Sequence, residues 1–509
     1  MKSKYVLALT IYTVVGDAMS SDDENYLTSE EFASDKRAKT SLVTAFLKDK
    51  FASAATQESA TIPLFREIYQ AIEANDDSEL EAVVLTGGVT NYSYKLYVTN
   101  CPELCLFAKL SFAYAAWNPD RSAHFDLQRT SNEYEIMQTF SKIKPNCVVA
   151  PLACYDIEQD GQKMKLLVTE YSKADEQFAN QHIEGSVDIR LAPKLADMLA
   201  AIHNMQGIDP TFNDQCKLNV AGLNEQILEY VKEICASTTP KDRTERYMVE
   251  TGGDVMINVV QTMHYEYLNC RDSLQHGDCH VFNTLVESKP SIEKLEAFGP
   301  NGDLVQCDWE MSFVGPKGLD VGVCLSYPIM CMMVHARNGY TNAVLSIKTY
   351  AATLLECYEQ RMLEAGKTSE EMSDIMRHVV GWCGCFFFQV FYFLRVFLDT
   401  LPVNSEDDRE FIRDTMGALG LKMIRVCYDN DFCTERSSSV EVRRVFMSLL
   451  EEEVAGSAQS RSPGMRKTAI QPRRLSSLRA SNRRVSDACI SSMAFSSREL
   501  SLLSVEEDK

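Results

Sequence analysis

The chain has 509 residues, of which 45% are hydrophobic and 24% charged, so it can bury a large core and does not have the composition of a disordered protein. Its formal net charge of −21 argues against a general nucleic-acid-binding surface, because phosphate backbones attract basic proteins. The 17 cysteines lie in apolar runs without the spacing of a zinc site, which favours buried free thiols in a reducing compartment such as the cytoplasm.

The N-terminus leaves two alternatives. Lys2 and Lys4 precede an apolar run over residues 5–16, which has the length of a signal-peptide core. The favoured interpretation is an ordinary strand or helix of a cytoplasmic protein, with a signal peptide at residues 1–20 as the alternative. Because residues 21–40 are polar and charged, residues 1–40 are predicted to form a lead-in before the folded part.

Helices and then strands are predicted next. Residues 41–74 have helical apolar spacing, and from Leu80 the pattern changes to strand, glycine turn and alternating strand over residues 82–98. The turn contains Gly87 and Gly88, which permit backbone amides to approach phosphate oxygens closely. An ordinary hairpin turn is the alternative interpretation of the same glycines.

A single lysine interrupts the next predicted strand. Lys109 lies in the apolar run 105–110, where it either reaches solvent from a strand end or holds an anionic group. The later run 166–171 is a strand that ends in polar residues, as expected of a hinge between lobes. Backbone groups from Val168 to Tyr171, including Glu170, are predicted to hydrogen-bond an adenine edge.

Three further segments are predicted to be core helices. Residues 192–203 have helical apolar spacing with Pro193 in the first turn, and His203 is interpreted as a packing residue. The apolar runs 319–334 and 381–398 approach membrane-spanning length, but each contains charged or strongly polar residues. No membrane span is therefore predicted.

The central motif begins at His276-Gly277-Asp278 and continues to Asn283. Strand-forming residues at 284–286 and 304–307 flank a turn signal, which predicts a hairpin that brings Asn283 close to Asp308. Phosphoryl transfer from ATP needs a carboxylate beside the attacking hydroxyl and oxygen ligands for Mg²⁺. Asp278 is predicted to orient or deprotonate the hydroxyl, with Asn283 and Asp308 as metal ligands.

These residues, together with the segment 307–322, resemble the catalytic segment of the aminoglycoside phosphotransferase and choline kinase superfamily. Within it, the Asp-x-Glu, Gly-Pro-x-Gly and Asp-Val-Gly steps are most similar to methylthioribose kinase. The resemblance covers roughly residues 80–430, to within the usual error of such boundaries. It implies an α+β, protein-kinase-like fold with a β-rich N lobe and a helical C lobe.

The resemblance also implies roles for individual residues. Glu310 joins the metal site, and Asp320 braces the catalytic loop. Gly87, Gly88 and Asn91 form the ATP loop, as in choline and ethanolamine kinases. Lys109 holds the α and β phosphates, and its partner is expected to be Glu133, with Glu135 as the alternative.

The implied activity is transfer of the γ-phosphate of ATP, with Mg²⁺, to a hydroxyl of a small molecule. A methylthioribose-like sugar is the favoured acceptor, and choline or ethanolamine is the alternative. A nucleotide-binding protein without turnover, like a pseudokinase, is a different alternative. The expected domains are the lead-in 1–40, the N lobe 41–170, the C lobe 171–455 and a tail 456–509.

One departure from the family concerns the acceptor. The family carries an Arg pair shortly after a Gly-Cys step, whereas here Gly384-Cys385 is followed by apolar residues, Gln389 and Val390. Arg395 and Arg425 are the nearby cations that could replace the pair. Methylthioribose is therefore expected to be a poor acceptor unless one of them reaches the site.

The tail is predicted to be disordered. Residues 461–486 contain basic residues and no acidic ones, with few apolar residues to build a core. An Arg-Arg-x-Ser pattern occurs at 473–476 and again at 483–486. Ser476 and Ser486 are therefore predicted targets of a basophilic protein kinase.

Overall fold

The computed structural model describes residues 34, 37–56, 62–75, 77–85, 90–114, 125–172, 174, 176–237, 239–287, 304–395, 397–401, 403, 405–428 and 437–459. The chain divides into two compact units. The strand-rich unit contains the described residues up to 145 and residues 149–172, and the helical unit contains residues 146–148 and those from 174 onward. The chain passes from one to the other just after the predicted hinge strand.

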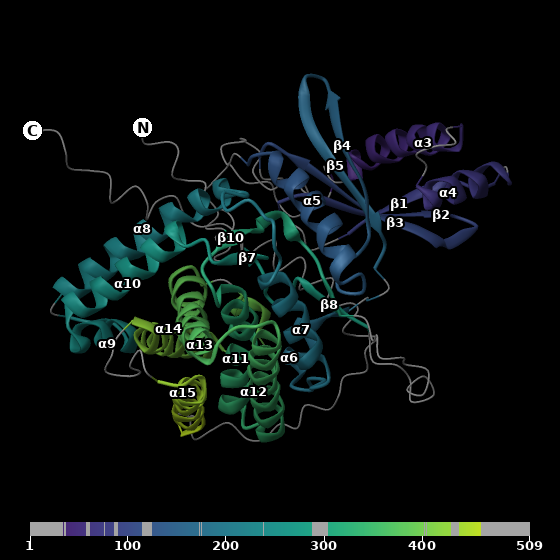
Figure 1. Cartoon of the computed structure of the whole chain (residues 1–509). Coiled ribbons are helices and arrows are strands. Elements are labelled where there is room, and N and C mark those ends of the chain that lie inside the picture. Colours follow the sequence, from purple (N-terminus) through teal and green to yellow (C-terminus); the bar gives the residue numbers. More distant parts are fainter. Residues whose placement is uncertain are drawn as a thin grey trace, which may run out of the picture. The chain divides into compact units, whose positions relative to one another are not determined.

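The strand-rich unit is built on a five-stranded antiparallel sheet with the order β1-β2-β3-β5-β4 (Figure 1). Side chains alternate between buried and half-buried along β2, as expected of a strand with one face on the core. The third strand begins at Cys101, before the predicted start at Cys105. The strands are β1 (Leu80–Val84), β2 (Tyr92–Val98), β3 (Cys101–Phe112), β4 (Pro151–Gln159) and β5 (Gln162–Glu170).

Three helices pack on this sheet. Helices α3 (Thr40–Thr56) and α4 (Pro63–Glu73) bury Val43, Leu47, Phe51, Phe65 and Ile68 in one core with strand side chains. Helix α5 (Gln128–Ile143) packs against β4 and β5. The sheet therefore holds α5 in place, which matters because α5 carries both candidate carboxylates for Lys109.

The helical unit has ten described helices and short strands between them. The helices are α6 (Phe178–Glu184), α7 (Leu191–His203), α8 (Asp214–Ala236), α9 (Arg243–Thr251), α10 (Gly253–Asn269), α11 (Leu319–Asn338), α12 (Thr341–Glu364), α13 (Ser369–Phe386), α14 (Glu406–Tyr428) and α15 (Ser439–Gln459). The strands are β6 (Glu176–Gln177), β7 (Ser273–Gln275), β8 (Thr284–Val286), β9 (Leu304–Gln306) and β10 (Phe313–Gly315). Two 3₁₀ turns, η2 (Trp309–Met311) and η4 (Leu398–Thr400), and a π-helix, η3 (Phe387–Phe393), complete the described elements.

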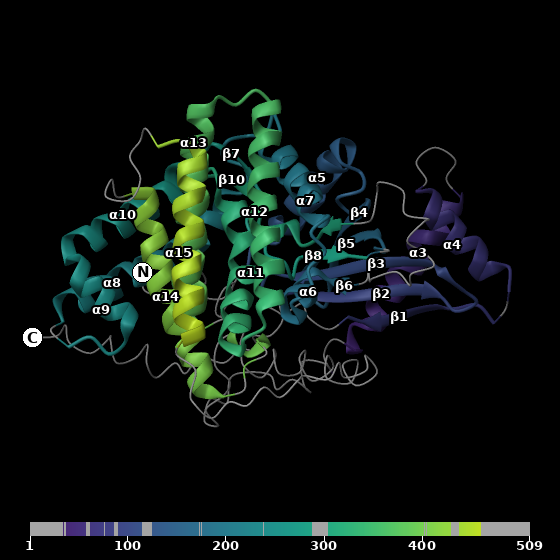
Figure 2. The same cartoon turned by 90° about the horizontal axis from the view of Figure 1, so that it is seen from below.

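Helix α11 is the centre of the helical unit and packs against α12, α13 and α15 (Figure 2). Among the described helices it alone is long and apolar enough to cross a membrane, yet that stretch is entirely buried inside the protein. The residues of α13 from Val379 to Phe386 are also buried. The run 319–334 is thus a core helix, as predicted. The run 381–398 begins as one, but α13 ends at Phe386 and is followed by the π-helix η3 and the 3₁₀ turn η4, so this run is not a single core helix.

The predicted α+β class is confirmed, with strands concentrated in the N-terminal unit and helices in the C-terminal one. The predicted start of the tail at Gly456 is wrong, because α15 continues to Gln459. Glu453 on α15 pairs with Arg243 at 2.6 Å and with Lys422 at 2.8 Å, and Ser457 is also buried. These tertiary contacts extend the helix through a Gly/Ser sequence that by itself favours a loop.

Several predictions concern residues outside the described ranges. They are the signal-peptide alternative at 1–20, Gly87 and Gly88 of the predicted ATP loop, and Ser476 and Ser486 of the tail.

Candidate functional site

The two strands of the hairpin that was predicted after the central motif are present. Strands β8 and β9 pair antiparallel, with Thr284 opposite Gln306 and Val286 opposite Leu304. Just beyond them, the N–H of Cys307 donates to the carbonyl oxygen of Asn283 at 2.8 Å. Asp308 therefore follows directly on a residue bonded to Asn283, which is the proximity the sequence predicted.

The loop before Asp278 turns sharply at Gly277. This residue has a φ of +84°, and a Cβ there would lie 2.2 Å from the carbonyl oxygen of Met311. Only glycine combines that backbone conformation with such a close approach. The preceding strand β7 pairs with β10, where Gln275 lies opposite Phe313, so the loop starts from a fixed base.

Asp320 braces the loop as predicted. Its carboxylate is fully buried and accepts the N–H of His276 at 2.6 Å and the N–H of Gly277 at 3.0 Å. His203 lies 3.3 Å from the same carboxylate and 2.8 Å from the hydroxyl of Tyr358. His203 is thus part of the brace, a role that helical spacing alone did not indicate.

Asp278 is held by two side chains within its own loop. Asn283 donates from Nδ2 to Oδ2 of Asp278 at 3.0 Å, and Nε2 of His280 lies 3.4 Å from Oδ1. Burial raises the pKa of the Asp278 carboxyl, but His280 and Asn283 outweigh burial and hold the pKa below its usual value. The carboxylate is therefore ionised at neutral pH, as an acceptor of a hydroxyl proton must be.

His280 was not singled out from the sequence, although its position two residues after Asp278 is a usable signal. Burial lowers the pKa of His280, but the neighbouring Asp278 raises it more, so the net pKa lies above the usual value. The imidazole and the carboxylate thus stabilise each other's charged forms. The side chains of Asp278 and His280 are 19% and 12% exposed, so both can be reached from solvent.

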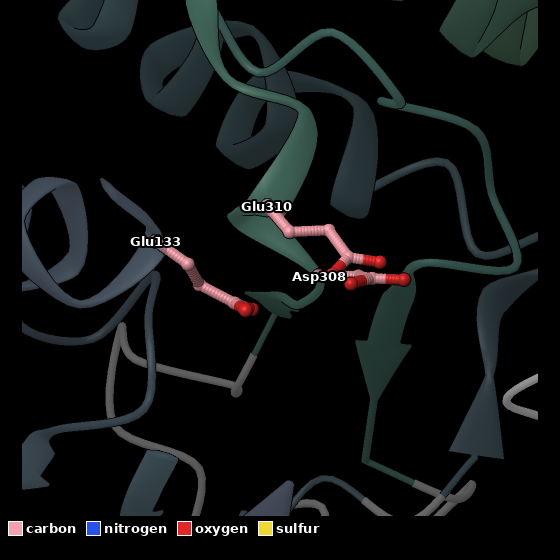
Figure 3. A group of neighbouring side chains, drawn as sticks. All are labelled: Glu133, Asp308 and Glu310. Carbon is pink, nitrogen blue, oxygen red and sulfur yellow. The ribbon is translucent and has the colours of Figure 1, made fainter. Parts of the chain in front are cut away.

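Asp308 and Glu310 supply a pair of carboxylates. Asp308 follows β9 and has a left-handed φ of +62°, which Asp tolerates better than most residues. Figure 3 shows its carboxylate beside that of Glu310, and the two offer oxygen atoms within 4.8 Å of one another. Carboxylate oxygens at such a separation suit a hard cation such as Mg²⁺.

In the strand-rich unit, Lys109 on β3 pairs with Glu133 on α5. Its Nζ lies 2.9 Å from Oε2 of Glu133, and both residues are buried. The alternative partner, Glu135, is exposed on the other side of α5. The structure therefore selects Glu133, because helical geometry turns Glu135 away from the sheet.

Asn91 lies just before β2 and is also held from α5. Arg129 donates from Nη2 to Oδ1 of Asn91 at 2.9 Å and from Nη1 to the carbonyl oxygen of Phe112 at 3.1 Å. Arg129 and Asn91 are both buried. One helix thus positions Asn91 as well as Lys109, and the role of Asn91 toward a nucleotide stays a prediction.

The pairing of Lys109 gives a stability prediction. Glu133→Gln should lower the free energy of unfolding of the strand-rich unit by about 3 kcal/mol, because it removes the carboxylate opposite a buried ammonium. Glu135→Gln is the matched control on the same helix and should change that free energy by less than about 0.5 kcal/mol. Amide hydrogen exchange in β3 and β5 measures both, and equal effects of the two substitutions would contradict the selection of Glu133.

The backbone of Val168 and Glu170 is engaged within the sheet. Strand β5 lies between β3 and β4, and Val168 pairs with Ala108 on one side. The N–H of Glu170 donates to the carbonyl oxygen of Ala150 at 3.0 Å. The role of Val168 and Glu170 toward an adenine edge stays a prediction.

The cations considered as replacements for the family's Arg pair have partners of their own. Arg395 lies 3.3 Å from Glu410, and Arg425 donates to the hydroxyl of Tyr247 at 3.1 Å. Gln389 lies in the π-helix η3 and donates to the buried Asn224 at 2.8 Å. None of these contacts includes the loop of Asp278.

Comparisons with known proteins give structural similarities. No protein-family model matches the sequence, and no curated protein is similar to it in sequence. Among solved structures, the chain is similar to a microcompartment-associated aminopropanol kinase, at 10% identity and a TM-score of 0.36, covering 75% of this chain and 94% of that one.

Two others are an aminoglycoside phosphotransferase from Alicyclobacillus acidocaldarius (10% identity, TM-score 0.35, 79% and 98% covered) and a Plasmodium vivax ethanolamine kinase (10%, 0.27, 78% and 90%). At this identity and TM-score the similarities assign no activity. The chemistry therefore has to be argued from the chain's own residues.

Proposed function

We propose that this chain is a small-molecule kinase that transfers the γ-phosphate of ATP to a hydroxyl group with the help of Mg²⁺. The observation that carries the proposal is the loop from His276 to Asn283. It holds the ionised carboxylate of Asp278 between His280 and Asn283 on a base fixed by Asp320. Such a carboxylate can orient an acceptor hydroxyl and take its proton as the phosphoryl group arrives.

The residues proposed to hold Mg²⁺ fit a hard cation. Asn283 donates from Nδ2 to Asp278, so its Oδ1, which lies in the same amide plane, points away from that hydrogen bond. With Asp308 and Glu310 the donor set consists of oxygen atoms, the type that Mg²⁺ prefers. When bound, the ion would neutralise charge on the phosphate groups.

The proposed reaction also needs a cation for the phosphate groups of ATP, and Lys109 is our candidate for it. Lys109 is a buried ammonium on a strand and is fixed by a carboxylate from a helix. In protein kinases a lysine in this situation holds the α and β phosphates of ATP. We assign that role to Lys109, with Glu133 as the residue that orients it.

The acceptor is proposed to bind without the contacts to a sugar and to phosphoryl oxygens that the family's Arg pair would make. Arg395 and Arg425 are engaged with Glu410 and Tyr247, and Gln389 is neutral. A neutral amide gives weaker and less directional binding to phosphoryl oxygens than a guanidinium. Methylthioribose is therefore expected to be a poor acceptor, and choline and ethanolamine are the alternatives to test beside it.

The deciding experiment measures ATP consumption by the purified protein with a panel of acceptors. The panel holds methylthioribose, choline, ethanolamine, an aminopropanol and an aminoglycoside, each with and without Mg²⁺. Acceptor-dependent and Mg²⁺-dependent formation of ADP and a phosphorylated product supports the proposal. Tight ATP binding without turnover of any acceptor would favour the pseudokinase alternative instead.

A prediction follows for Asp308. Asp308→Ala should weaken Mg²⁺-dependent ATP binding by about tenfold or more. Loss of a residue that only supports a metal ligand already costs about 10–100-fold in metal affinity, and here a proposed ligand itself is lost. The control is Asp407→Ala, which removes the same charge from an exposed position on α14. Titration of ATP with and without Mg²⁺ measures both. Unchanged metal-dependent affinity in Asp308→Ala would remove Asp308 from the metal site.

A further inference from the structure

Phe397 has a backbone conformation that a bulky residue rarely adopts. After the π-helix η3, both Arg395 and Phe397 have left-handed φ angles, +57° and +64°. Positive φ is costly for a large side chain, so surrounding contacts must hold the segment in place. The hydroxyl of Thr400 donates to the carbonyl oxygen of Phe397 at 2.6 Å and lies 2.7 Å from the hydroxyl of Tyr327.

The ring of Phe397 packs on the loop of Asp278. It stacks on Phe282 with ring centroids 4.9 Å apart and planes 9° from parallel. It meets the ring of His280 edge to face at 5.4 Å and 73°. Stacked and edge-to-face geometries are the favourable ones for aromatic rings, so these contacts stabilise one orientation of the His280 ring.

The His280 ring then determines the position of the Asp278 carboxylate. Nε2 of His280 lies 3.4 Å from Oδ1 of Asp278, while Asn283 donates to Oδ2. The carboxylate is thus held at both oxygens, one of them by a ring that Phe397 contacts. A rotation of that ring would release Oδ1 and leave Asp278 free to turn.

We propose that Phe397 is a positioning residue that fixes the ring of His280 and, through it, the carboxylate of Asp278. The positive φ of Phe397 then has an explanation, because this backbone conformation places the ring of Phe397 against the loop of Asp278. The kinetic consequence rests on the proposed kinase function, whereas the contact with His280 is testable without it.

Three substitutions of Phe397 distinguish the effect of its ring from the effect of its backbone conformation. Phe397→Gly removes the ring and relieves the positive φ, so any loss in this variant comes from the ring rather than from a misfolded turn. Phe397→Leu keeps an apolar side chain, and Phe397→Tyr keeps the ring. The matched control is Phe393→Leu, because Phe393 lies in η3 and packs on Tyr230 at 5.4 Å.

The first measurement is the NMR spectrum of the His280 ring protons, with histidine labelled and His280→Asn used for assignment. We expect the His280 resonance to move in Phe397→Gly and Phe397→Leu, since it loses the ring current of Phe397, and to stay near its wild-type position in Phe393→Leu. Phe397→Tyr should restore it. An unmoved resonance in Phe397→Gly would overturn the proposal whatever the activity of the protein.

The second measurement is steady-state kinetics with the acceptor that the panel experiment identifies. Phe397→Gly and Phe397→Leu should lower kcat by about 10- to 100-fold with KM for ATP changed less than about twofold, because a misplaced catalytic group costs transition-state stabilisation. Phe397→Tyr should recover most of kcat. A displaced His280 resonance with wild-type kcat would also overturn the proposal. An inactive wild-type protein would refute the kinase function and leave the NMR result to decide the contact.

Discussion

Replacement of Asp278 by asparagine is expected to lower kcat by about 10²- to 10⁴-fold while the affinity for ATP changes little. Asparagine has the same shape, so the change removes the charge and the proton acceptor but keeps the volume of the side chain. In the proposed mechanism Asp278 acts on the acceptor hydroxyl in the transition state and does not contact the nucleotide, so its loss should appear in kcat and not in ATP binding.

The experiment needs a control for the loss of a negative charge. Asp407→Asn removes a carboxylate from an exposed position of the same unit and should leave kcat within about twofold, as surface substitutions usually do. Single-turnover measurements with saturating ATP separate the chemical step from binding and release. Turnover near the wild-type rate in Asp278→Asn would reject the assignment of Asp278 and, with it, the central support of the proposed mechanism.

The parts of the site that the sequence predicted are those encoded within short segments. Asp278 and Asn283 lie five residues apart in one loop, and the hairpin that follows was indicated by two strand-forming runs around a turn signal. The pairing of Lys109 with Glu133 was implied by the family resemblance, which left Glu135 as the alternative. The structure distinguishes the two, because Glu133 is buried against Lys109 and Glu135 is exposed.

The parts that were missed depend on contacts between distant segments. Phe397 reaches His280 from beyond η3, and neither the π-helix nor the positive φ of Phe397 has a signal in the sequence. His203 was interpreted as a packing residue because its helix has ordinary apolar spacing, yet it lies 3.3 Å from Asp320. Local patterns place residues on elements, and only tertiary structure shows which polar side chains meet.

The same reason explains the error at the tail. A segment rich in Gly and Ser after Glu453 favours a loop on propensity alone. The ion pairs of Glu453 with Arg243 and Lys422 hold the last turns of α15 against α9 and α14, and this tertiary stabilisation outweighs the local preference.

Asp320 is expected to give the largest loss of stability of any single substitution discussed above. Asp320→Ala should lower the free energy of unfolding of the helical unit by about 3–5 kcal/mol, since it leaves the N–H groups of His276 and Gly277 buried without their acceptor and takes a partner from His203. Asp320→Asn keeps one carbonyl oxygen and should lose less. Chemical denaturation, followed by a spectroscopic signal that reports on the helical unit, measures the free energies of unfolding of the two variants.

A comparison with Asp408 distinguishes the loss of the Asp320 hydrogen bonds to the loop from a general loss of stability of the helical unit. Asp408 is also a buried carboxylate of the helical unit, but it pairs with Arg337 at 2.5 Å and accepts a hydrogen bond from Ser405 at 2.9 Å, both outside the loop of Asp278. Asp408→Ala should destabilise the unit while hydrogen exchange at His276 and Gly277 stays slow at a temperature where the protein is folded. Asp320→Ala should accelerate exchange at those two amides and lower kcat under the same conditions, because the loop that carries Asp278 loses its anchor. If both substitutions leave the two amides equally protected, the hydrogen bonds of Asp320 contribute only to the core, and the rigidity of the loop must come from the close fit of Gly277 against Met311.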